Sequence, residues 1–300
     1  GMKRSLDYFQ RAIEKDPDYP LPHVGIADTY GILGFFEFLA PEEAFSRCSA
    51  AVNRALEQDD SLGEAHASRA WIHFCYDWDW SAAEREFMRA IELSPDYATA
   101  WEWYAVFLMS LSRHGEAIAA AERARELDPL SLIINGVVGV TYMFARQYDQ
   151  GIAECRKALD MDRGFYLARV WLGLGYQLAG EAEAASEEFR KAAEAEFDNP
   201  YALGYLGWGL GASGHEDEAL SVLARLEERS GGQYVTPYQK GMVLAGLRRT
   251  DEAFDLFEEA FRLRSPQLVL ANASPQYASL RSDPRFQALV RRIGFPSAPV

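Results

Sequence analysis

Small residues recur along this chain at intervals of 34 residues, and this recurrence constrains the fold more than any other feature. One column comprises Ser5, Cys48, Ala83, Ala117, Gly151, Ala185, Ala219 and Ala253; its first two intervals are 43 and 35 residues, and the other five are 34. A second column follows seven residues later and comprises Ala12, Ala55, Ala90, Ala124, Ala158, Ala192, Leu226 and Ala260. Self-similarity at a fixed period predicts a stack of identical structural units rather than a single globular core.

Each unit has the pattern of two helices joined by a turn. Small, bulky and small residues at positions i, i+4 and i+7 fall on one helical face, as in the segments 83–90 and 253–260. Gly180 and Gly214 fall where the first helix of a unit turns into the second, and Thr236 with Pro237 reads as the start of a helix. No segment has the alternating pattern of a strand, so the sequence predicts an all-α fold.

This 34-residue unit resembles the tetratricopeptide repeat (TPR). The clearest copies are WLGLGY (171–176) with AASEEFRKA (184–192), and WYAVFL (103–108) with IAAAERARELDP (118–129). The resemblance implies a right-handed α-solenoid of tandem helix-turn-helix repeats with a capping helix at its C-terminal end. It also implies a scaffold for protein–protein interactions, in which the first helices of the units line a concave, peptide-binding surface.

The periodicity divides the chain into four parts. Residues 1–19 read as the second helix of a truncated repeat, residues 20–62 as an extended TPR, residues 63–267 as six units of about 34 residues, and residues 268–300 as a C-terminal cap. The first helix exposes Leu6, Phe9 and Ile13 without a partner helix. Either the polypeptide is cut from a longer one, or another chain covers that face, for example a second copy in a homodimer.

The extended TPR contains about eight additional residues near 34–43, with the sequence GFFEFLAPEE. Phe35, Phe36, Phe38 and Leu39 would be costly in an exposed loop. We therefore expect a longer helix whose overhang packs on the neighbouring unit; the alternative is a docking element.

The C-terminal segment has its own pattern. Asp283 and Pro284 predict the first turn of a final amphipathic helix with Phe286, Leu289, Val290 and Ile293 on one face. The runs LRSDPRF (280–286) and RRIGFP (291–296) resemble the end of bacterial signalling proteins in which such repeats follow a winged-helix, kinase or cyclase domain. The alternative function is therefore that of a regulatory or sensor module in a larger protein of that kind.

Charge and composition argue against several other functions. The formal net charge of −15 disfavours nucleic acid as a direct ligand, and no apolar run is long enough to cross a membrane. The three cysteines are too scattered for a disulfide framework or zinc site and suit a reducing compartment, which favours a cytoplasmic location. The run Gly209–Gly214 matches GxGxxG but lacks a preceding strand. We expect no catalytic residues, no metal and no cofactor.

The repeat register predicts which side chains line the concave surface. The predicted peptide-binding residues are Asp28, Trp71, Glu102, Val106, Met109, Val140, Met143, Val170, Leu174, Gln177, Trp208, Tyr238 and Met242. None is a lysine or arginine, so capture of a peptide carboxylate is not expected. Apolar anchors beside Asp28 and Glu102 favour an apolar protein or peptide partner with some basic character. The alternatives are that Trp71, Trp208 and the methionines only pack between helices, or that the surface senses a small molecule.

Overall fold

Paired helices form the body of the molecule in the computed structural model, which describes residues 2–195, 199–230 and 234–296. Over these residues no strand is present. The α-helices are α1 (Met2–Lys15), α2 (Leu21–Phe35), α3 (Pro41–Gln58), α4 (Gly63–Ile72), α5 (Trp80–Leu93), α6 (Ala98–Ser110), α7 (His114–Leu127), α8 (Leu132–Phe144), α9 (Tyr148–Met161), α10 (Tyr166–Ala179), α11 (Ala182–Ala195), α12 (Pro200–Ala212), α13 (Glu216–Arg229), α14 (Pro237–Gly246), α15 (Thr250–Arg262) and α16 (Pro284–Ile293). A π-helical turn, His73–Asp77, extends α4, and two 3₁₀ turns, Pro266–Leu270 and Pro275–Tyr277, precede α16.

Local sequence signals set the helix boundaries. The side chain of Thr236 accepts a hydrogen bond from the amide of Tyr238 and caps α14, as the sequence predicts. Asp283 caps α16 in the same way, and Phe286 and Ile293 on that helix are buried. Gly180 ends α10 with a φ of 87°, a left-handed conformation that side chains disfavour.

The small-residue columns mark the contacts between paired helices. Ala83, Ala185 and Ala253 are 0% exposed, and each lies on the second helix of its unit. On α8, a Cβ added at Gly139 would lie 2.6 Å from Sγ of Cys155 on α9. The absence of side-chain bulk therefore lets the two helices of this unit approach closely.

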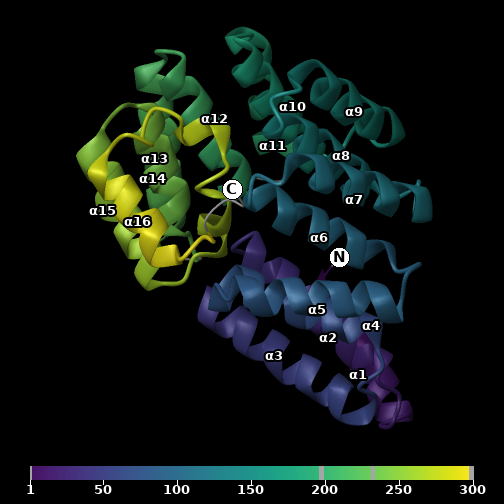
Figure 1. Cartoon of the computed structure of the whole chain (residues 1–300). Coiled ribbons are helices and arrows are strands. Elements are labelled where there is room, and N and C mark those ends of the chain that lie inside the picture. The colour runs from purple at the N-terminus through teal and green to yellow at the C-terminus, as the bar shows by residue number, and fades with distance from the viewer. Residues whose placement is uncertain (1, 196–198, 231–233, 297–300) are drawn as a thin grey trace.

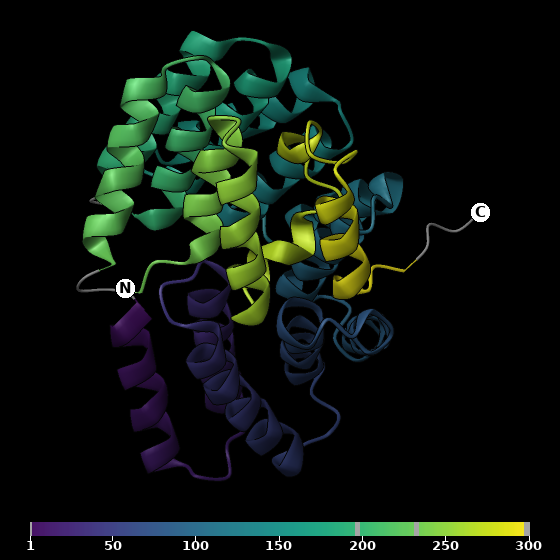
Figure 2. The same cartoon turned by 90° about the vertical axis from the view of Figure 1, so that its left-hand side faces the viewer.

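The chain curves until its last quarter contacts its first helices (Figures 1 and 2). Oγ of Ser265 donates to Oε1 of Glu37 at 2.5 Å, and Nε2 of Gln267 donates to the carbonyl of Phe35 at 2.5 Å. Nε1 of Trp80 donates to the carbonyl of Ile293 at 3.2 Å. These bonds join residues more than 200 positions apart, so the stack is closed by long-range contacts.

The segment 34–43 takes part in this closure, which corrects the expectation of an overhang packed on the neighbouring unit. Helix α2 ends at Phe35 and α3 begins at Pro41. Phe35 does pack on Trp71 of the next unit, but the ring of Phe36 meets that of Tyr201 at 5.3 Å. Glu37 is 2% exposed, and burial raises its pKa to about 7. The insertion is therefore an internal docking element between the two ends of the array.

Helix α1 lies at the edge of the molecule and packs on α2 (Figure 2). Leu6, Phe9 and Ile13 are partly buried. The end residues of two predicted segments, Gly1 and 297–300, lie outside the described residues.

Candidate functional site

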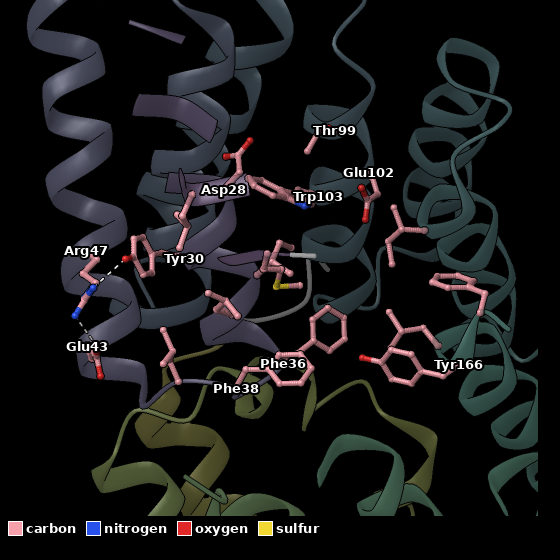
Figure 3. A pocket seen from close by; sticks show the side chains of 18 residues that line it. Asp28, Tyr30, Phe36, Phe38, Glu43, Arg47, Thr99, Glu102, Trp103 and Tyr166 are labelled. Carbon is pink, nitrogen blue, oxygen red and sulfur yellow. Dashed lines mark hydrogen bonds and ion pairs between the residues drawn. The ribbon is translucent and has the colours of Figure 1, made fainter. Parts of the chain in front are cut away.

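A cavity of about 990 Å³ opens on the face formed by the first helices of several units, near the N-terminal end of the array (Figure 3). We call it the N-terminal cavity. Its lining residues are Met2, Leu6, Asp28, Tyr30, Ile32, Leu33, Phe36, Phe38, Leu39, Glu43, Arg47, Thr99, Glu102, Trp103, Ile133, Phe165, Tyr166 and Leu167. They come from α1, α2, α3, α6, the N-terminal ends of α8 and α10, and the insertion. Most of the wall is apolar, which is typical of sites that bind small molecules or peptide side chains.

Asp28 is a partly buried carboxylate on the cavity wall, held by two hydroxyl groups. Oγ of Ser68 on α4 donates to its Oδ1 at 2.5 Å, and the hydroxyl of Tyr97 donates to its Oδ2 at 3.2 Å. Burial raises the pKa of Asp28 to about 7, although both hydrogen bonds act in the opposite direction. The side chain is therefore fixed in position and titrates near neutrality.

Glu102 projects from α6 into the same cavity and is only 7% exposed (Figure 3). No residue that the structure describes forms a hydrogen bond or ion pair with its carboxyl group. Burial raises its pKa to about 8, and the nearby charge of Asp28 adds to the effect. Because the carboxyl group faces the cavity, its missing hydrogen-bond donor can come only from what occupies that cavity, which is solvent or a ligand.

Among the side chains that the structure describes on the cavity wall, Arg47 is the one basic side chain, and it lies at the rim. Nη1 of Arg47 donates to the hydroxyl of Tyr30 at 2.9 Å, and its Nη2 forms an ion pair with Glu43 at 2.8 Å. About half of each charged side chain is exposed. Arg47 is thus engaged with neighbours of its own at the rim.

The structure brings only two of the predicted peptide-binding residues, Asp28 and Glu102, together in the N-terminal cavity. A small deeper cavity of about 60 Å³ also touches Glu102 and is lined by four others of the predicted set: Trp71, Val106, Met109 and Val140. The remaining apolar ones are buried in packing between helices: Met143, Val170, Leu174, Trp208, Tyr238 and Met242. Gln177 is partly exposed and donates to Oγ of Ser213 at 3.2 Å.

The chain's own non-repeated segments cover much of the predicted surface. Phe36 from the insertion and Leu270 from the C-terminal segment line the small cavity beside Val106 and Val140. Farther along, Nε2 of Gln276 contacts Sδ of Met242 at 3.0 Å. These segments occupy the space that an external ligand would need.

Neighbouring groups also fill the space beside three glycines on the first helices α8 and α12. A Cβ at Gly136 would lie 2.4 Å from the ring of Trp171, and one at Gly204 would lie 2.1 Å from Oε1 of Gln239. A Cβ at Gly211 would lie 2.7 Å from the backbone nitrogen of Leu247. These glycines admit neighbouring helices rather than a ligand.

Several cavity residues were not predicted from the sequence. Trp103, Ile133, Phe165 and Tyr166 lie outside the register positions assigned to the concave surface. Phe36 belongs to the insertion, whose position could not be derived from the repeat. The cluster of apolar residues in that insertion was an available signal for Phe36, whereas Trp103, Ile133 and Tyr166 lie within repeat helices and carry no such signal.

Other polar clusters offer little chemistry within the described residues. No group of three or more histidine, cysteine or acidic side chains is placed to hold a metal ion there. Nδ1 of His66 lies 2.6 Å from Glu86, and Nδ1 of His73 lies 2.8 Å from Asp77, so each is engaged with a carboxylate. Gly209 and Gly211 are inside α12, where their amides belong to the helix. No described helix is long and apolar enough to span a membrane.

The fold is that of the tetratricopeptide-repeat proteins, as comparison with solved structures shows. Human IFIT1, in a dimer with m7Gppp-AAAA, is 15% identical and matches 87% of this chain and 68% of its own with a TM-score of 0.61. The APC/C hetero-tetramer Cut9–Hcn1 is 15% identical over 97% of this chain and 55% of its own, with a TM-score of 0.60. PilW, a type IV pilus biogenesis factor, is 23% identical over 73% of this chain and 98% of its own, with a TM-score of 0.52. No protein-family model and no curated protein matches the chain.

Proposed function

We propose that this chain is a non-catalytic scaffold that binds a peptide or protein segment in the N-terminal cavity. The observation that carries the proposal is the cavity itself: about 990 Å³, with a mainly apolar wall and acids at its base. A volume of this size accommodates several side chains of an extended segment. The segment enters between the insertion and the helices α6, α8 and α10.

Charge complementarity defines the partner's chemistry. The part of the cavity wall that the structure describes carries Asp28, Glu43 and Glu102 against one base, Arg47, and the whole chain has a net charge of −15. Opposite charge favours encounter with a partner and excludes acidic competitors. We therefore propose an apolar segment that contains lysine or arginine, and no direct nucleic-acid ligand.

The cavity redefines which of the predicted residues would take part. Asp28 and Glu102 contact the ligand directly, together with Phe38, Ile133 and Tyr166. Residues such as Met143 and Met242, both 0% exposed, support the helices that carry the cavity. A cytoplasmic location suits this scaffold, because all three cysteines are free thiols.

Peptide selection followed by matched substitutions tests this function. A displayed random-peptide library is selected against the full chain, and the affinity of the selected peptide is measured by fluorescence anisotropy. We expect Phe38→Ser and Ile133→Ser to weaken binding about tenfold or more, because both remove apolar cavity wall. Leu130→Ser is the matched control, since Leu130 is 80% exposed and lies outside the cavity.

Two results would contradict the proposal. One is that no peptide is selected; the other is that Leu130→Ser weakens binding as much as the cavity variants do. Circular dichroism of each variant establishes that helicity is retained. The alternative predicted from the sequence, a regulatory module of a larger bacterial signalling protein, stays a prediction. The native size of the protein in a lysate of the source organism tests it.

A further inference from the structure

Glu102 differs from Asp28 and Glu37, the two other carboxyl groups in the described part of the chain whose pKa is raised by burial. Asp28 accepts hydrogen bonds from Ser68 and Tyr97, and Glu37 accepts one from Ser265. Glu102 is only 7% exposed, yet no described residue donates a hydrogen bond to it. Its carboxyl group instead faces the N-terminal cavity (Figure 3). Buried carboxylates normally accept hydrogen bonds. A ligand in the cavity could supply the donor that Glu102 does not receive from the described residues.

The charges around Glu102 define the sign of that ligand. Asp28 lies close enough for its charge to oppose ionisation of Glu102. Arg47, the one basic group among the described wall residues, is engaged at the rim with Tyr30 and Glu43. A cation placed between Asp28 and Glu102 would relieve their mutual repulsion and pair with both.

The walls define the rest of the ligand. Trp103 follows Glu102 in the chain, and its ring stacks on that of Trp71 at 4.8 Å while lining the cavity. Ile133, Leu167 and Phe36 add apolar surface nearby. Lysine and arginine bury an alkyl stem along apolar surface, and aromatic rings attract their charged ends.

We propose that the N-terminal cavity contains a subsite for an organic cation on an alkyl stem, with Glu102 as the residue that contacts the charge and Asp28 as its support. The group is an ammonium or guanidinium, supplied by a lysine or arginine side chain of a bound peptide or by a free alkylamine. For the peptide source the inference rests on the proposed function; for the free amine it stands alone.

Binding at this subsite is linked to proton release. The pKa of Glu102 is raised to about 8 and that of Asp28 to about 7, so both carry protons at slightly acidic pH in the empty cavity. A cation pairs with the ionised forms, and a lysine-like ammonium stays charged up to about pH 10. Affinity therefore increases with pH between 6 and 8. The other charged or titratable groups that face these acids are Tyr30, Glu43, Arg47, Glu64, Tyr97 and Tyr166.

The test uses n-butylammonium chloride and butan-1-ol as charged and neutral probes of similar shape. Their binding to the full chain is measured by saturation-transfer NMR at constant ionic strength, at pH 6 and pH 8. The variant Glu102→Gln retains the shape of the side chain and removes its charge. Glu126→Gln is the matched control, because Glu126 is an exposed acid on α7 that pairs with Arg123.

We expect n-butylammonium to bind the wild type more tightly at pH 8 than at pH 6, and butan-1-ol to bind weakly at both. Glu102→Gln should weaken cation binding at least tenfold at pH 8, whereas Glu126→Gln should leave it unchanged. The proposal is overturned if the cation does not bind the wild type at millimolar concentration, or if Glu102→Gln binds the cation as tightly as the wild type does. It is also overturned if butan-1-ol binds the wild type as tightly as n-butylammonium does. If Glu102→Gln does not fold, Asp28→Asn replaces it and should weaken binding by a smaller factor.

A peptide arm separates this proposal from the proposed function. A selected peptide is compared with its copy in which lysine is replaced by norleucine. Preference for lysine that is lost in Glu102→Gln supports the peptide source. If peptides bind both proteins without regard to lysine and n-butylammonium does not bind, the cation subsite is wrong and the scaffold function stands. If n-butylammonium binds in a manner that depends on Glu102 but no peptide binds, the subsite stands for free amines and the scaffold function is wrong.

Discussion

The two ends of the concave face have the same repeat architecture but differ in what covers them. At the N-terminal end, first helices α2 and α6 border an open cavity that contains Glu102, to which the described residues donate no hydrogen bond. At the C-terminal end, Tyr238 and Met242 on α14 are 4% and 0% exposed, beneath residues that include Gln276 and Tyr277. The repeat thus determines the helix pairs, while the non-repeated segments determine where a ligand has access.

The largest effect is expected when the cover of the C-terminal end is removed. Tyr277 is 1% exposed and its ring meets those of Tyr238, Phe257 and Phe286. Tyr277→Ala should lower the free energy of unfolding by about 3–5 kcal/mol, because it leaves a large cavity. Urea denaturation measures the loss, and hydrogen exchange should increase first in α14–α16. Uniform exchange along the chain would contradict this local role.

Replacing a glycine at a helix crossing should lower the free energy of unfolding by a similar, intermediate amount at both ends. A Cβ at Gly139 on α8 would lie 2.6 Å from Cys155, and one at Gly241 on α14 would lie 2.9 Å from the ring of Phe257. Gly139→Ala and Gly241→Ala should each cost about 1–3 kcal/mol through overpacking. Thermal denaturation of the two variants checks this. A large cost at one end alone would mean that the two ends differ in their helix pairing as well as in their cover.

The partnerless acid gives the open end a distinctive pH dependence. Glu102 has a pKa of about 8 in the folded chain against an ordinary value of 4.5, so the folded state binds more protons than the unfolded state between these values. Its contribution to stability is therefore lost as pH rises from about 4.5 to 8, by at most about 1.4 kcal/mol per pH unit. Glu102→Gln should remove this slope, so its stability relative to wild type should increase with pH.

Chemical denaturation of both proteins at pH 5, 7 and 9 measures that difference, since the other titrating groups are common to both. A constant difference across this range would show that Glu102 is ionised in the folded chain throughout, and would contradict the burial argument.

The smallest change in stability is expected at the rim of the open cavity. Phe38 is 39% exposed, and its ring is part of the cavity wall. Phe38→Ala should change the free energy of unfolding by less than about 1 kcal/mol, because little packing is lost. Thermal denaturation measures this, and a loss as large as that of Tyr277→Ala would show that the insertion is part of the core.

Much of the fold could be predicted from the repeat, because periodic small residues such as Ala83 and Gly139 report contacts within one unit. The N-caps Thr236 of α14 and Asp283 of α16 could also be predicted from the sequence, because capping depends on neighbouring residues. These features are local in sequence, and the signal for each one lies within the segment it describes.

The candidate site was predictable only in part, because it depends on contacts between distant segments. The repeat register predicted Asp28 and Glu102 as ligand-binding residues, and both line the N-terminal cavity. It made the same prediction for Trp208 and Met242, which are buried and do not line that cavity. The difference comes from pairs such as Phe36 with Tyr201 and Gln276 with Met242. Nothing in a 34-residue period indicates that residues 34–43 contact the far end of the chain.

Hydroxyl-radical footprinting of the full chain tests most directly whether the concave face is open at one end and covered at the other. We predict rapid labelling of Phe38 at the cavity rim and of Met88, which is 52% exposed on α5, with strong protection of Tyr238 and Met242. Labelling of Met242 at the rate of Met88 would contradict the account, because it would show that the C-terminal segment does not cover the concave face at Met242.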